Sequence, residues 1–279
     1  MPDNEAKRWR DLRKRFLSAL VLGPLVLLCI WLGAEPWTAM IAAGVAVLAW
    51  EWVHLCGLRT RQWPGIAVPA AVLAAGAFAV IESTGLALLA LVAGAALTWL
   101  AAAGPRATAQ RRPPHWLAAG VLYVGIAGIA LIELRHDNQA GRANVLFLFL
   151  VVWASDIGAY MAGRLIGGPR LAPAVSPNKT WSGAAGGFAA AILIGTAAAH
   201  ILAPGGTASA AATAAMLGIM AQAGDLLESG IKRHFQVKDT SSLIPGHGGL
   251  LDRLDGVLAA APVAALLAMA SGQGQPLWR

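Results

Sequence analysis

The sequence has few charged residues and few cysteines, and each shortage argues against a class of protein. Only 13% of its 279 residues are charged, whereas 57% are hydrophobic and the mean hydropathy is +0.62. An ordinary soluble domain carries about 25% charged residues, so this composition does not fit one. The two cysteines, Cys29 and Cys56, lie in or at the end of apolar runs without metal-ligand spacing. This argues against a disulfide framework and against a zinc site.

Two further patterns are missing. A membrane β-barrel would show alternating segments of about ten residues, but the apolar runs here reach roughly 20 residues, enough to cross a bilayer as helices. The chain also shows no internal repeat of the kind found in inverted-repeat transporters. We therefore predict an all-α, polytopic integral membrane protein.

Apolar run length predicts about nine transmembrane helices. We expect them near residues 16–34, 37–56, 66–81, 85–103, 116–134, 143–167, 183–203, 208–228 and 254–270. Five of the seven Asp, Glu, Lys and Arg residues inside these spans fall after residue 142. We therefore divide the chain into an N-terminal transmembrane scaffold with a basic N-terminus, 1–142, and a C-terminal catalytic transmembrane domain, 143–279.

The basic residues predict the orientation. The formal net charge is +7, and six of the 21 basic residues lie in the first fifteen positions, directly before an apolar run. Such a cluster is typical of a cytoplasmic N-terminus beside anionic lipid, so we do not take it as a sign of nucleic-acid binding. Counting basic residues in alternate loops then puts the segments 164–182 and 229–253 on the cytoplasmic side. We expect a multi-pass protein of the cell (inner) membrane.

The most charged part of the chain is 229–255, with two carboxylates just upstream. Glu228, Ser229 and Lys232 follow Asp225 by three, four and seven residues. This spacing places all four on one face of a helix. A charged residue at a helix centre in lipid costs roughly 2.5–3.5 kcal/mol, so such a row needs water, a partner or a metal. A solvated Glu–Lys pair at a helix end would explain the row equally well.

A second acidic face opens the next span. Asp252 and Asp255 repeat the offset of three and can approach the first face across the intervening loop. Carboxylates from two helices suit magnesium, which prefers oxygen ligands. The loop contains a glycine-rich turn, 244–249, whose backbone N–H groups could approach a phosphate, although such a turn is a weak signal. Four cations surround it: Lys232, Arg233, Lys238 and Arg253. His247 suits an acid, a base or a hydrogen-bond donor to phosphate.

Two smaller groups are polar as well. The sixth span carries a polar face with Asp156, Tyr160, Gly163 and Arg164. The loop after it offers Lys179 beside two hydroxyls, Ser176 and Thr180; it is not a Walker A loop, because the spaced glycine is missing. Lys179 can equally be an ordinary positive-inside residue. Glu51 and His54, at the end of the second span, can pair with each other and receive no role.

The segment 229–255 resembles the signature of phosphatidate cytidylyltransferases, also called CDP-diacylglycerol synthases. The matching residues are Ser229, Lys232, Arg233, Lys238, Asp239, Ser241, Pro245, His247, Gly248, Gly249, Asp252, Arg253 and Asp255. The similarity extends to Gly224, Asp225, Glu228, Ser176, Pro177, Lys179, Thr180, Trp181, Gly183, Asp156, Ala159 and Tyr160. Ser182 departs from the pattern, since many members carry an acidic residue there.

The resemblance implies a reaction in which CTP and phosphatidic acid give CDP-diacylglycerol and pyrophosphate. It implies a magnesium-dependent enzyme in the lipid bilayer, commonly a homodimer, with Asp225 and Asp252 as metal ligands. A second, monovalent cation such as K⁺ is also implied as an option. Charge neutralisation and positioning should supply most of the catalysis.

We assign roles on this basis. The expected catalytic residues are Asp225, Asp252, Lys232, Ser229 and Asp255. The expected substrate-binding residues are Lys179, Arg233, Lys238, His247, Gly248, Gly249, Arg253 and Asp156. No general base is required, because phosphatidate is already ionised near neutral pH.

Two other functions stay open. A CTP-dependent kinase of a polyprenol or phytol would need the same nucleotide, metal and membrane, but would release CDP instead of pyrophosphate. An ion-coupled transporter using Asp156 and Asp225 would move a substrate without consuming CTP, and the missing repeat counts against it.

Overall fold

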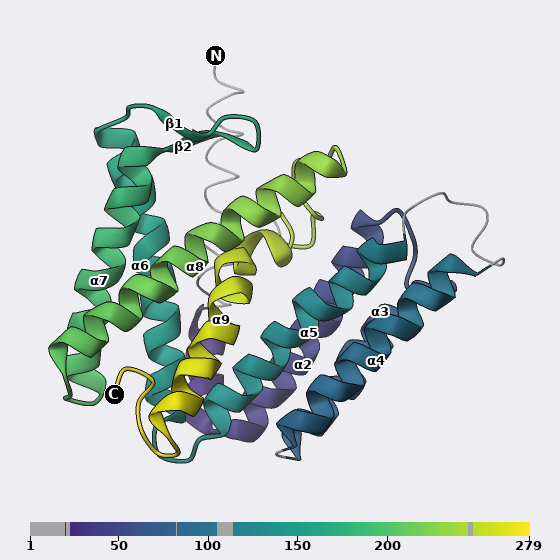
Figure 1. Ribbon diagram of the computed structural model, residues 1–279, viewed down its shortest axis with the longest axis horizontal. Helices are drawn as coiled ribbons and strands as arrows, with labels where there is room; N and C mark the ends of the chain where they lie inside the picture. The colour runs from purple at the N-terminus through teal and green to yellow at the C-terminus, as the bar shows by residue number, and fades with distance from the viewer. Residues whose placement is uncertain (1–19, 21–22, 82, 105–113, 245–247) are drawn as a thin grey trace.

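The computed structural model describes residues 20, 23–81, 83–104, 114–244 and 248–279, and these are nearly all helical. Helices α3 and α4 lie at one flank, α6 and α7 at the other, and α2, α5 and α9 between them, while α8 runs diagonally from the α7 flank toward the middle (Figure 1). The helices are α2 (Ala34–Leu55), α3 (Ala67–Val80), α4 (Thr84–Ala103), α5 (Pro114–His136), α6 (Gly141–Leu165), α7 (Trp181–Leu202), α8 (Thr207–His234) and α9 (Leu251–Ser271). A shorter helix, Gly23–Leu32, precedes them.

Within the described part of the chain, seven helices are long and apolar enough to cross a membrane: α2 and α4 to α9. This confirms a helical, multi-pass membrane protein but not nine spans. The third expected span forms α3, whose 14 residues reach only about 21 Å, less than the roughly 30 Å of a bilayer core. The first expected span lies partly outside the described residues. The orientation stays a prediction.

Helix α8 runs further than expected. We placed the end of this span at Glu228, but α8 continues to His234. The charged residues do not end the helix, because Lys232 Nζ lies 2.6 Å from Glu228 Oε2, a pair four residues apart on one face that supports helical structure. The charged row therefore belongs to the final turns of a single long helix.

The loop after α6 contains a short hairpin that the sequence did not predict. Strands β1 (Arg170–Ala172) and β2 (Ser176–Thr180) pair antiparallel, and strands of three and five residues are too short to show a period. Thr180 caps α7, since its Oγ1 accepts a hydrogen bond from the backbone N–H of Gly183. Arg233 Nε donates to Val175 O at 3.3 Å. The segments 164–182 and 229–253 therefore meet at the same end of the bundle, as predicted.

Small residues and one amide hold α6, α7 and α8 together. A Cβ placed on Gly158 of α6 would lie 2.8 Å from the carbonyl oxygen of Gly186 in α7, so only glycine permits this approach. Gln222 Nε2 of α8 donates to Ser155 Oγ at 3.3 Å and to Ala184 O at 3.1 Å. These contacts join three helices next to the places where α6 and α8 carry Asp156 and Asp225.

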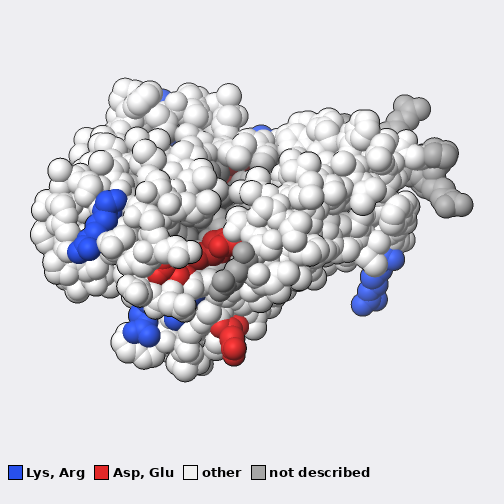
Figure 2. All heavy atoms as spheres, turned by 60° about the horizontal axis from the view of Figure 1, so that its bottom comes forward, with Lys and Arg blue, Asp and Glu red and all other residues white. Residues whose placement is uncertain are grey.

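At the other end of the bundle, a cavity of about 800 Å³ opens among α4, α5, α6 and α9. Figure 2, which brings the lower end of Figure 1 forward, shows acidic side chains in a hollow on this face. The two carboxylates lining the cavity already have partners. Glu133 accepts from Thr84 Oγ1 at 2.7 Å, and Asp137 accepts three backbone N–H groups. We therefore attribute both to the structure of this end.

Asp137 should make the free energy of unfolding depend on pH in the acidic range. Burial opposes its ionisation, but bonds from the N–H groups of Ala140, Gly274 and Gln139 outweigh burial and hold its pKa below the ordinary value. The stabilisation is therefore complete above the ordinary carboxyl pKa and is lost as pH falls through the lower, folded-state pKa. Asp137→Asn turns an amide toward one of these donors and should cost about 1 kcal/mol at pH 7. Thermal unfolding should show this difference at pH 7 and a smaller one near pH 3; equal differences would contradict the assignment.

Candidate active site

Three carboxylates meet where α8 and α9 pack together. Asp225 and Glu228 of α8 and Asp255 of α9 each place one oxygen within 4.8 Å of the other two. Gly224 makes this possible, because a Cβ there would press against the carbonyl oxygen of Asp255 and lie 2.6 Å from Ala259 Cβ. The predicted meeting of two acidic faces is thus confirmed for these three side chains.

This group fits a hard cation. Glu228 is 1% exposed, and its Oε1 is buried without a hydrogen-bond partner in the described residues. A buried polar atom of this kind is costly unless something satisfies it. Carboxylate oxygens from two helices are the ligands that Mg²⁺ prefers, and a cation among them would satisfy Glu228.

Lys232 and Asp252 form a second, adjoining cluster. Lys232 Nζ lies 2.6 Å from Glu228 Oε2 and 2.8 Å from Asp252 Oδ1. The other oxygen of Asp252 accepts hydrogen bonds from Thr240 N at 2.9 Å, Thr240 Oγ1 at 3.0 Å and Gly249 N at 2.8 Å. Both oxygens of Asp252 are therefore engaged. The structure groups Asp225 with Asp255, and the Asp225–Asp252 metal pair stays a prediction.

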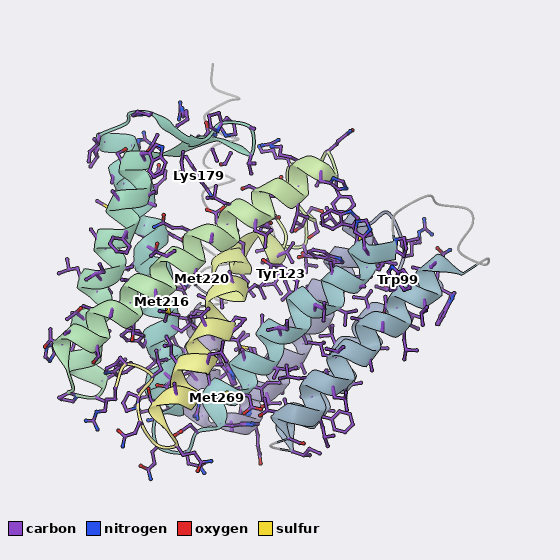
Figure 3. All side chains as sticks on the ribbon, viewed as in Figure 1. Trp99, Tyr123, Lys179, Met216, Met220 and Met269 are labelled. Carbon is purple, nitrogen blue, oxygen red and sulfur yellow. The ribbon has the colours of Figure 1, made fainter. Side chains whose placement is uncertain are left out.

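Lys179 reaches the carboxylates from the hairpin. Its Nζ lies 2.6 Å from Asp225 Oδ2, and Figure 3 shows this residue between the hairpin and α8. Asp156 of α6 is near enough for the charges of Asp225 and Lys179 to act on it. On the same helix, Arg164 Nη1 donates to the Tyr160 hydroxyl at 2.7 Å. Lys179 and Asp156 thus join the site that the sequence placed in 225–255, whereas the printed contacts of Arg164 and Tyr160 are with each other.

The other predicted residues that the structure describes lie on α8, in the loop after it and in the first turn of α9. Ser229 is half-buried on α8. Gly248 has φ +84°, a conformation that favours glycine. The N–H of Gly249 donates to Asp252, so it is not free for a phosphate here. His247 lies outside the described residues. Three of the predicted substrate-binding cations are exposed here: Arg233, Lys238 and Arg253.

Sequence reasoning missed Glu51, a fully buried residue of α2. Its Oε1 accepts from Ser241 Oγ at 2.6 Å and Leu250 N at 2.8 Å, and its Oε2 accepts from Leu251 N at 2.7 Å. The expected pairing of Glu51 with His54 is wrong, since His54 Nδ1 bonds to a backbone oxygen of its own helix. A carboxylate in an apolar span is a functional candidate by default, and that signal was present in the sequence.

Tyr123 of α5 is a second residue from the N-terminal half at this site. Its hydroxyl is buried and has no hydrogen-bond partner in the part of the chain that the structure describes. The charges of Asp255 and Glu228 act on it, and Figure 3 places it between α5 and α9. The candidate site is therefore not confined to residues after 142.

Comparison with known proteins extends the likeness beyond the charged segment. A family model described as the cytidylyltransferase family matches residues 13–270. A phosphatidate cytidylyltransferase of Brucella suis is 40% identical over 253 residues, covering 90% of this chain and 91% of its own length. The namesake in Pseudomonas aeruginosa is 36% identical over 277 residues, covering 95% and 100%. The one in Bacillus subtilis is 29% identical over 259 residues, covering 90% and 96%. These matches include the N-terminal helices, for which the sequence alone suggested only shared apolar spans.

Proposed function

The chain belongs to the cytidylyltransferase family, and from this premise we propose that it converts CTP and phosphatidic acid into CDP-diacylglycerol and pyrophosphate. The observation that carries the proposal is the meeting of Asp225, Glu228 and Asp255 with Lys179 and Lys232 at one end of a bundle of apolar helices. Such a site can hold a nucleotide and its metal while the lipid tails stay in the bilayer. The names and coverage of the relatives support the same reaction.

We propose that Asp225, Glu228 and Asp255 hold Mg²⁺. When bound, the ion would neutralise phosphate oxygens and the leaving pyrophosphate. Asp252 could become a ligand only by giving up its bonds to Lys232 or to the loop. We therefore propose that Asp252 positions Lys232 and the loop. The resemblance also implies a second, monovalent cation such as K⁺, which we place at the same group.

The chain's own residues would position the two anionic substrates. An oxygen of the phosphatidate phosphate attacks the α-phosphorus of CTP, a new P–O bond forms, and the bond to the bridging oxygen breaks to release pyrophosphate. Lys179 and Lys232 lie among the carboxylates, and the exposed cations at this end can neutralise the triphosphate and the lipid phosphate. Among these exposed cations we assign this role to Arg233, Lys238 and Arg253. Because the attacking oxygen is already ionised, the step needs no general base.

We propose that this end faces the cytoplasm and that the protein resides in the cell (inner) membrane. The basic N-terminal cluster and the basic residues of the alternate loops support this orientation. The resemblance further supports assembly as a homodimer.

The first test is pyrophosphate release by the purified protein in detergent with CTP, Mg²⁺ and phosphatidic acid. We expect release only when all three are present, with CMP transferred to the lipid. Release of CDP would instead support the lipid kinase. Transport of a substrate in vesicles without consumption of CTP would support a transporter. Either outcome, or no release where a known cytidylyltransferase is active, would contradict the proposal.

A further inference from the structure

The first turn of α9 begins with backbone N–H groups that no residue of the helix itself can satisfy. Glu51 of α2 satisfies two of them, accepting from Leu250 N at 2.8 Å and from Leu251 N at 2.7 Å. The N-terminus of a helix carries partial positive charge, so a carboxylate is well placed there. The helix that carries Asp252 and Asp255 is thus capped by a residue from a distant helix.

Glu51 also holds the loop that leads into α9. Ser241 Oγ donates to its Oε1 at 2.6 Å, while Asp252 accepts from Thr240 and Gly249 in the same loop. The loop therefore lies between two carboxylates, one from each half of the chain. The space is tight, because a Cβ on Gly249 would lie 2.7 Å from Glu51 Oε1.

These contacts set the position of the site carboxylates. Asp255 follows Leu251 by four residues and so lies one turn further along the same face of α9. A shift of the first turn would move Asp255 relative to Asp225 on α8, and the three-carboxylate group spans no more than 4.8 Å. A small displacement would therefore change how the group holds a cation.

We propose that Glu51 is a positioning residue: it fixes the loop and the first turn of α9 and thereby sets the spacing of the carboxylates that hold the metal. It touches none of the reacting atoms. This inference rests on the proposed function and on its magnesium site.

A purely structural role for Glu51 makes a different prediction. Loss of folded protein would lower the maximal rate but leave the magnesium concentration at half-maximal activity unchanged, because every molecule that still folds has an ordinary site. Displaced carboxylates would raise that concentration. The magnesium saturation curve therefore separates the two roles.

The test compares Glu51→Gln with the unaltered protein. The amide keeps the volume but turns an NH₂ group toward backbone or hydroxyl donors, which leaves a buried donor unpaired. We expect the half-saturating magnesium concentration to rise about tenfold and kcat to fall about tenfold, the effect of one such loss. Hydrogen exchange, measured without substrates or metal, should become faster at Leu250 and Leu251 and stay unchanged in α3 and α4.

Two further variants make the comparison specific. Ser241→Ala removes one of the three donors to Glu51 and should give a smaller change in the same direction. Glu133→Gln makes the same chemical change at the opposite end of the bundle, where its partner is Thr84, and should leave magnesium saturation unchanged.

The outcomes separate this inference from the function it rests on. If the unaltered protein releases no pyrophosphate, the proposed function fails. If the protein is active and Glu51→Gln keeps its magnesium saturation and kcat, only the role of Glu51 is overturned. A variant that loses maximal rate with unchanged magnesium saturation and faster exchange throughout the bundle also overturns it, because the residue is then structural.

Discussion

Replacing Asp225 by Asn should abolish magnesium-dependent pyrophosphate release, with kcat lowered at least about 100-fold. The change removes the charge at the centre of the carboxylate group and the partner of Lys179, 2.6 Å away. Asp255→Asn should have a similar effect, since Asp255 supplies the α9 side of the same group. Activity measured over a range of magnesium concentrations, together with thermal unfolding, would show loss of turnover without loss of the fold.

Two variants complete this experiment. Glu35→Gln changes an exposed carboxylate at the start of α2 and should leave activity unchanged. Asp252→Asn distinguishes the two roles considered for Asp252: a direct ligand would raise the half-saturating magnesium concentration, whereas an anchor of Lys232 and the loop would mainly lower the unfolding temperature. Full activity in Asp225→Asn would reject the metal assignment.

Replacing Lys232 by Met should cause the largest loss of stability. Lys232 Nζ lies 2.6 Å from Glu228 and 2.8 Å from Asp252, two carboxylates that are 1% and 4% exposed. Removing one partner of a buried ion pair costs about 3–5 kcal/mol, because the remaining charge is left unpaired. Unfolding in detergent, followed by tryptophan fluorescence, would measure the decrease.

Matched changes show whether the loss comes from unpaired charge. Lys238→Met alters an exposed lysine of the same segment and should change the free energy of unfolding by less than about 0.5 kcal/mol. Adding Glu228→Gln to Lys232→Met removes one of the two unpaired charges and should recover part of the stability. Equal stabilities of Lys232→Met and Lys238→Met would contradict this explanation.

The features that were predictable from the sequence are those set by local spacing. An offset of three places Asp225 beside Glu228 on α8 without any knowledge of the fold. The apolar runs predicted the bounds of α2 and of α4 to α9 to within a few residues, apart from the end of α8. The end of α8 was missed because the apolar run stops where the charged residues begin. The helix itself continues through the Glu228–Lys232 pair.

The features that were missed depend on contacts between distant segments. Lys179 was recognised as a candidate, but nothing local shows that a hairpin carries it to Asp225. Likewise, Asp252 and Asp255 look equivalent in the sequence. The packing of α9 against α8 turns Asp255 toward the carboxylates and Asp252 toward Lys232 and the loop. The position of Glu51 within an apolar run marked it as a functional candidate, but spacing alone could not identify its partners.

The bonds of Glu51 also bear on how the protein is made. Its backbone partners lie 199 and 200 residues later in the chain, so at about 5–20 residues per second the ribosome needs about 10–40 s to supply them. During that interval α2 carries a carboxylate without its final partners, and an unpaired carboxylate in an apolar span is unfavourable. Among the helices that the structure describes, the first long one, α2, is thus completed by the last, α9, and a polypeptide that stops before residue 250 lacks both backbone donors to Glu51.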